Sequence, residues 1–74
     1  MSRLHPEKPK EVIRKLREAG FEGPFGGGKH VTMRHPDSGK KIPIPIHGGR
    51  DIPVGTLRAI LREAEISPLE WEKL

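Results

Sequence analysis

The chain has 74 residues, among them 14 Lys or Arg, ten Asp or Glu, nine Gly, eight Pro and no Cys. A chain of this length buries only about 60% of the surface that its unfolded form exposes. It is too short for a doubly wound sheet or a barrel enzyme, and the lack of cysteine excludes disulfides, thiolate zinc sites and thiol nucleophiles. We therefore expect a single domain over residues 1–74 with a thin core.

The net charge of +4 is unevenly distributed. Residues 1–62 carry a net charge of +7, and residues 63–74 carry −3. A basic body with an acidic tail favours an anionic partner such as RNA or DNA, although a solvated surface without a partner has the same charge pattern. No apolar run approaches the roughly 18 residues of a membrane span, and residues 1–6 lack the apolar core of a signal peptide. We expect a cytoplasmic protein with no membrane partner.

Residues 9–19 are predicted to form the first helix. Pro9 suits a first helical turn, where its missing N–H is not needed. Apolar side chains at helical spacing line one face of this segment, and they are Val12, Ile13, Leu16 and Ala19. Gly20 has the position of a left-handed helix cap, and Phe21 can fold back onto the helix. Residues 22–29 are rich in glycine and contain at most a short strand.

Two segments of alternating polarity follow, residues 30–34 and 41–46, and a turn at residues 36–39 joins them. Pro43 and Pro45 remove two N–H donors from the same flank of the second segment. A strand with such a flank must lie at the edge of a sheet. The pattern therefore predicts an antiparallel pair whose second strand is protected from further pairing.

Residues 47–51 are predicted to form a loop and residues 56–64 a second helix, with Gly55 and Thr56 capping its start. Ser67, Pro68 and Glu70 have the spacing of a capping box that opens a last short helix. Trp71 and Leu74 on that helix are expected to pack against the core. The expected fold class is α+β, with two or three antiparallel strands covered by helices on one face.

Two motifs that suggest other chemistry fail on inspection. Gly23 to Lys29 has the spacing of a phosphate-binding loop, but His30 stands where Ser or Thr would hold Mg²⁺, and a strand rather than a helix follows. The four histidines have no spacing that places two ligands on one face, as a metal site needs. We expect no bound metal and no cofactor.

Residues 24–50 contain five cationic side chains against the single carboxylate of Asp37. The cations are Lys29, Arg34, Lys40, Lys41 and Arg50. The same segment holds His30, His35 and His47 and glycine-rich backbone. Cations and glycine N–H groups bind phosphates, and an imidazole can move a proton. These are the ingredients of metal-free RNA cleavage, although a nucleic-acid-binding surface or a solvated face would contain them too.

At this point the sequence resembles the HicA (YcfA-like) toxins, the RNA-cleaving halves of bacterial toxin–antitoxin pairs. The resemblance covers about residues 9–67. It rests on Gly28-Lys29-His30, Arg34-His35-Pro36, Ile44-Pro45, Asp51-Ile52-Pro53 and the stretch from Gly55 to Arg62. The Pro-x-Gly-Thr-Leu-Arg stretch combined with the Gly-x-His step makes the resemblance specific.

The resemblance implies an α-β-β-β-α fold like that of double-stranded-RNA-binding domains, here with a short C-terminal helix added. It also implies metal-independent cleavage of mRNA, with His30 as the general base, and a HicB-type antitoxin as partner. We expect the free protein to be a monomer. Lys29 and Arg34 would contact phosphate, while Lys40, Lys41 and Arg50 would attract RNA to the surface.

The roles of His35 and His47 stay open, since each can either protonate the leaving oxygen or sit in a turn. The sequence departs from the family pattern in three places: Lys29 replaces a common Ser, Ala64-Glu65 replaces a common Ala-Gly, and the tail with Trp71 lies beyond the usual match. Two further functions fit the same residues. One is a non-catalytic RNA-binding module, and the other is a regulatory protein whose basic face docks an acidic antitoxin.

Overall fold

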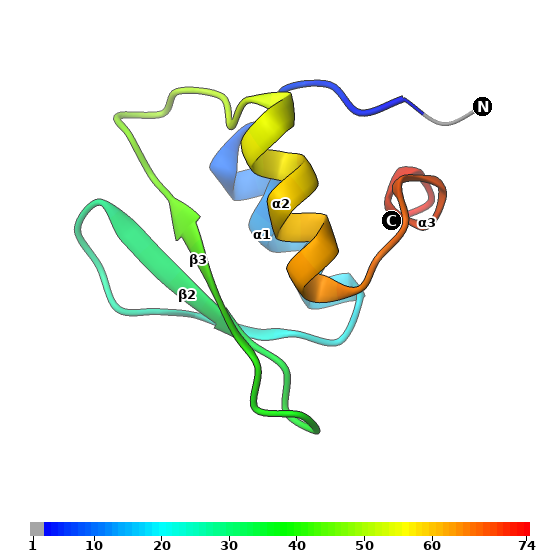
Figure 1. Cartoon of the computed structure of the whole chain (residues 1–74). Coiled ribbons are helices and arrows are strands. Elements are labelled where there is room, and N and C mark those ends of the chain that lie inside the picture. Colours follow the sequence, from blue (N-terminus) through cyan, green and yellow to red (C-terminus); the bar gives the residue numbers. More distant parts are fainter. Residues whose placement is uncertain (1–2) are drawn as a thin grey trace.

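The computed structural model describes residues 3–74. Met1 and Ser2, the first two residues of the N-terminal segment considered above as a signal peptide, lie outside this range. Helices and strands follow in the order α1 (Pro9–Glu18), β1 (Glu22–Phe25), β2 (His30–Arg34), β3 (Lys41–Pro45), α2 (Val54–Ala64) and α3 (Pro68–Glu72) (Figure 1). This confirms the predicted α-β-β-β-α order with a short C-terminal helix.

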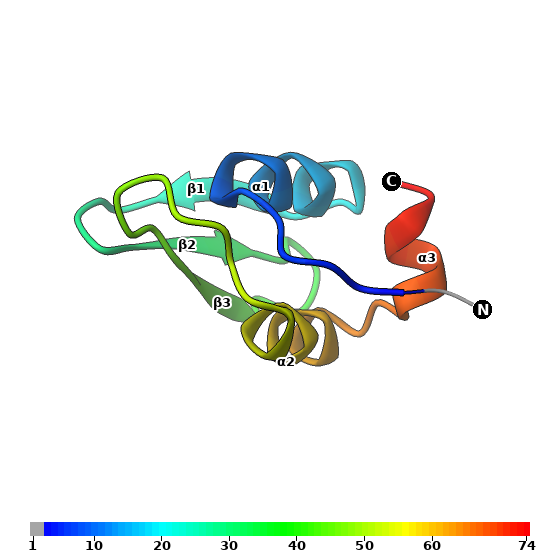
Figure 2. The same cartoon turned by 90° about the horizontal axis from the view of Figure 1, so that it is seen from above.

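The three strands form one antiparallel sheet in the order β1-β2-β3. The β2–β3 register runs from the pair His30 and Pro45 to the pair Arg34 and Lys41. Strand β3 therefore lies at an edge, as its two prolines predict. Helices α1 and α2 lie on the same side of the sheet, and no helix or strand within residues 3–74 covers the other face (Figures 1 and 2). We call this uncovered side the outer face.

The core lies between the sheet and the helices. The alternation of the strands turns Val31, Met33, Ile42 and Ile44 inward, and α1 and α2 meet them with Val12, Leu16, Leu57, Ile60 and Leu61. All nine are buried. Because successive side chains of a strand point to opposite faces, the same alternation turns His30, Thr32 and Arg34 of β2 to the outer face.

The start of α2 differs from the prediction. The helix begins at Val54 rather than Thr56, its N-cap is Pro53, and no side chain caps it. The Pro53 carbonyl accepts the first helical hydrogen bond from Leu57 N–H at 2.8 Å. Gly55 and Thr56 thus lie inside the first turn, and the prediction that they cap the helix is wrong. The extended backbone of Pro53 sets the start instead, with φ −64° and ψ 156°.

The buried carboxylate of Glu7 links residues near the two ends of the chain. Glu7 pairs with Ile52 in an isolated β-bridge. One oxygen of Glu7 accepts the indole N–H of Trp71 at 2.6 Å, and the other lies 3.3 Å from the Lys15 ammonium, which itself sits 5.1 Å from the Trp71 ring centre. Glu7, Lys15, Ile52 and Trp71, which we call the Glu7 cluster, join the N-terminal segment, α1, the loop before α2, and α3.

Helix α3 begins with the predicted capping box. Glu70 N–H donates to the Ser67 hydroxyl at 3.1 Å, and Ser67 N–H donates to the Glu70 carboxylate at 3.0 Å. Trp71 is buried and Leu74 packs partly against the core, as predicted. None of the helices in residues 3–74 has the length and apolar character needed to cross a membrane.

Candidate RNA-cleaving site

His30 and His47 lie side by side at one end of the sheet. Their ring centres are 5.9 Å apart, and the rings meet edge to face. Both side chains are exposed. The hairpin register explains the contact, because His30 pairs with Pro45 and the next residue of the same parity after Pro45 is His47. A hydrogen bond of 2.7 Å from Ile46 N–H to the Lys29 carbonyl extends the pairing beyond the strands.

His35 lies at the other end of β2 and has a structural role. Its Nδ1 accepts the backbone N–H of Asp37 at 3.2 Å within the turn, and its ring packs against Phe21 with centres 5.0 Å apart. Five residues of extended chain, about 16 Å, separate it from His30. Of the two histidines left open by the sequence, the structure brings only His47 to His30.

The five predicted cations fall into two groups. Arg34 pairs with Glu22 at 3.0 Å, and Lys40 pairs with Glu63 at 3.4 Å. Lys29, Lys41 and Arg50 are exposed and form no ion pair with any residue that the structure describes. Lys29 and Arg50 belong to the two segments that carry the histidines: Lys29 precedes His30, and Arg50 N–H donates to the His47 carbonyl at 2.9 Å. The charge at this end of the sheet is therefore positive.

A hollow opens on the outer face farther along β2, toward the pair of Arg34 and Lys41. It is lined by Phe25, Gly26, Thr32, Arg34 and Lys41. Phe25 is 49% exposed, and the sequence analysis did not single it out. The only signal for it is an aromatic residue placed between Pro24 and the glycine run, in a segment with no apolar periodicity.

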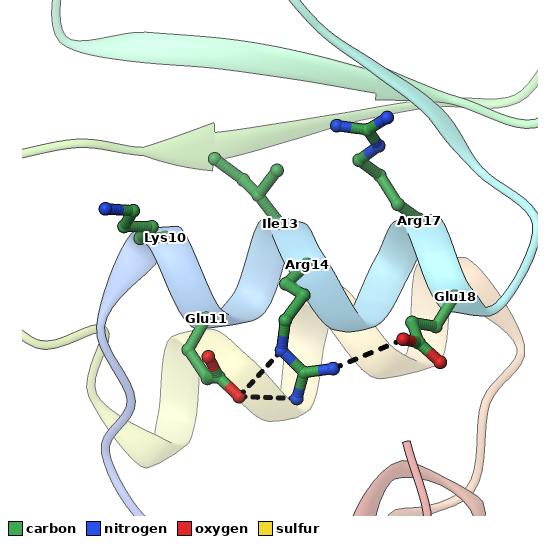
Figure 3. A pocket seen from close by; sticks show the side chains of 6 residues that line it. All are labelled: Lys10, Glu11, Ile13, Arg14, Arg17 and Glu18. Carbon is green, nitrogen blue, oxygen red and sulfur yellow. Dashed lines mark hydrogen bonds and ion pairs between the residues drawn. The ribbon is translucent and has the colours of Figure 1, made fainter.

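A second charged surface, on the exposed side of α1, has a different character. Arg14 lies between Glu11 and Glu18 and donates hydrogen bonds to both, while Lys10, Ile13 and Arg17 form a separate row along the helix (Figure 3). The hydrogen bond from Arg14 holds the pKa of the Glu11 carboxyl below its ordinary value. Arg14 is balanced by the two carboxylates, and no histidine or other proton-transfer group lies among these residues, so we place no site there.

No cluster of three or more His, Asp or Glu side chains within residues 3–74 is arranged to hold a metal ion. No curated protein sequence matches the chain. Residues 9–66 match the family described as the HicA toxin of bacterial toxin–antitoxin systems. This range spans α1, the whole sheet and α2, and it includes both histidines of the pair. The chain thus belongs to the HicA toxin family.

Proposed function

We propose that this HicA-family toxin is a metal-independent ribonuclease that cleaves mRNA, with His30 as the general base. Membership of the family supports the role of a toxin and the existence of an antitoxin partner. The finer proposal rests on one observation, the exposed pair of His30 and His47 at a positively charged end of the sheet. Imidazole is the side chain whose protonation changes between pH 5 and 8, so two of them can supply a base and an acid.

In the proposed reaction, His30 takes the proton of a ribose 2′-hydroxyl. The 2′-oxygen attacks the adjacent phosphorus, and the bond from phosphorus to the 5′-oxygen of the next nucleotide breaks. Protonated His47 gives its proton to that leaving oxygen. The products are a 2′,3′-cyclic phosphate and a free 5′-hydroxyl, so this step consumes no water.

The surrounding cations support this chemistry in two ways. Lys29 and Arg50 lie in the two segments that carry the histidines and would stabilise the negative charge that develops on the phosphate. Arg34, Lys40 and Lys41 would add long-range attraction for the RNA backbone, which carries no sequence preference by itself. We further propose that a HicB-type antitoxin covers this surface, and that the toxin acts on mRNA in the cytoplasm as a monomer.

The test is incubation of the purified toxin, free of antitoxin, with a long single-stranded RNA in EDTA. We expect the wild-type protein to cut the RNA and to leave 2′,3′-cyclic phosphate ends. His30→Ala should cut at least about a hundred times more slowly, the usual loss when a general base is removed. His5→Ala, which removes another exposed histidine in the N-terminal segment, is the matched control and should cut like the wild type.

Intact RNA with a folded wild-type protein would refute the ribonuclease and leave the non-catalytic RNA-binding module, which salt-sensitive retention of RNA would reveal. Equal cutting by the wild type and His30→Ala would refute the role of His30.

A further inference from the structure

We propose that Phe25 forms a stacking subsite for one nucleobase of single-stranded RNA on the outer face of the sheet. The proposal rests on the proposed function in that RNA is the ligand. It starts from exposure: Phe25 and Leu69 are the large apolar side chains most exposed in the described chain, at 49% and 55%. Leu69 belongs to α3, whereas Phe25 lines a hollow on the same face as His30.

An irregularity in β1 turns Phe25 to the outer face. Glu22 pairs with Arg34 and Phe25 pairs with Thr32, so three steps along β1 match two steps along β2. In a regular strand, residues three apart point to opposite faces, and an inserted residue restores the same face. Consequently Glu22 reaches Arg34 in an ion pair and Phe25 lies beside Thr32.

The surroundings of Phe25 suit a base and its phosphates rather than an apolar partner alone. Thr32 also lines the hollow, and Lys41, which has no ion-pair partner in the described chain, supplies positive charge, while Arg34 lines it as the partner of Glu22. Gly26 has no side chain to narrow it. Aromatic side chains beside cations are the usual construction of single-strand sites, because every base has a face that can stack and every linkage a phosphate.

The distance to the histidines fits the same ligand. Phe25 lies across from Thr32, and His30 is two residues away from Thr32 on the same face of β2. Two residues of strand span about 6.6 Å, a step comparable to one nucleotide of an extended chain. A base stacked on Phe25 would thus belong to a nucleotide at or next to the linkage whose 2′-hydroxyl His30 deprotonates. Phe25 is a positioning residue in this proposal and takes no part in proton transfer.

The experiment measures binding rather than cleavage, so that its failure is distinguishable from failure of the proposed ribonuclease. The parent protein carries His30→Ala to keep the RNA intact, and the probe is a fluorescein-labelled RNA of about four nucleotides, the short end of single-strand sites. Fluorescence anisotropy gives the Kd. We expect Phe25→Ala to raise the Kd by about five- to 150-fold, Phe25→Leu to lose most of the affinity, and Phe25→Trp to retain it. Leu69→Ala is the matched control and should leave the Kd unchanged.

A set of probes with one abasic nucleotide at each position completes the test. At one position of the probe, removal of the base should raise the Kd of the parent protein by about the same factor as the Phe25→Ala substitution does. The same abasic probe should leave the Kd of the Phe25→Ala protein unchanged. Unchanged affinity of Phe25→Ala would overturn the proposal. If every abasic probe changed the Kd of both proteins equally, the proposal would also be overturned. Stacking on Phe25 requires that one base contribute to the affinity of the parent and not to that of Phe25→Ala.

Discussion

Gly23 shows how a residue without a side chain allows β1 to pack closely against β2. Its φ is +130°, and a Cβ built there would lie 2.8 Å from the Thr32 carbonyl oxygen and 2.9 Å from the Met33 sulfur. We predict that Gly23→Ala lowers the free energy of unfolding by about 1–3 kcal/mol, because the strained backbone and the close approach both resist a methyl group. Chemical denaturation checks this.

Gly27→Ala is the control for that substitution. Nothing lies within 4 Å of its built Cβ, and its φ is not in the left-handed region. A change within about 0.5 kcal/mol is expected there. If Gly23→Ala were equally neutral, the close packing of β1 on β2 would be less strict than the distances indicate.

Glu7 is a second residue on which much depends. Its side chain is only 5% exposed and that of Lys15 only 11%, so Glu7→Ala would leave a buried ammonium without its carboxylate and the Trp71 N–H without its acceptor. We predict a loss of about 3–5 kcal/mol, most of the stability of so small a domain. Thermal and urea unfolding measure this loss.

Lys8→Ala is the control, because it breaks the exposed pair with Asp51 and should cost at most about 1 kcal/mol. Similar losses of stability in the two variants would contradict the importance of the buried carboxylate of Glu7.

At the scale of elements, helix α2 ends on an unusual residue. Glu65 has φ 58° and ψ 41°, the left-handed conformation that glycine adopts at helix ends without cost. We predict that Glu65→Gly raises the free energy of unfolding by about 1 kcal/mol. Ala59→Gly, in the middle of the same helix, should lower it by about the same amount. Calorimetry on both variants gives the comparison, and a loss of stability in Glu65→Gly would show that Glu65 is not strained.

Local rules predicted most of the elements. The capping box of α3, the alternation of β2 and the prolines of β3 each act within a few residues, and each prediction is confirmed. The start of α2 was misjudged because a threonine near a helix start suggests a cap, whereas Pro53 already provides the extended entry. The Glu7 cluster escaped prediction because it joins residues 64 positions apart, and no periodic pattern links them.

The candidate site was predictable in part. From the sequence, no spacing was found that places two histidines on one face, but the hairpin register, in which Arg34 faces Lys41, places His47 beside His30 and leaves His35 at the turn. Phe25 was not predictable, because its orientation depends on the irregular pairing of β1, which begins in a glycine-rich stretch without alternation.

For the molecule as a whole, the main electrostatic property is a set of exposed cations without ion-pair partners in the described chain, Lys41 on β3 and Lys29 and Arg50 in the loops beside His30 and His47. We predict that binding of single-stranded RNA weakens as salt is added, which gives a negative slope of log K, the association constant, against log salt. Each of Lys29→Gln, Lys41→Gln and Arg50→Gln should make this slope shallower by about 0.7, the contribution of one phosphate contact. Lys40→Gln should have a smaller effect, because Glu63 already balances that charge. Anisotropy titrations at several salt concentrations test this in the His30→Ala background. Equal slopes for all four variants would mean that the unpaired cations do not contact phosphate.

The Glu7 cluster also gives the protein a built-in optical signal. Trp71 is the only tryptophan, and it is buried beside a carboxylate and an ammonium, on α3 rather than on the sheet. Figure 1 places α3 beside the N-terminal segment, at the end of the molecule opposite the two loops that carry Lys29 and His47. Its emission should therefore change when the domain unfolds and stay constant when RNA binds. One sample can then report folding through its intrinsic fluorescence and RNA binding through the labelled probe, each without disturbing the other.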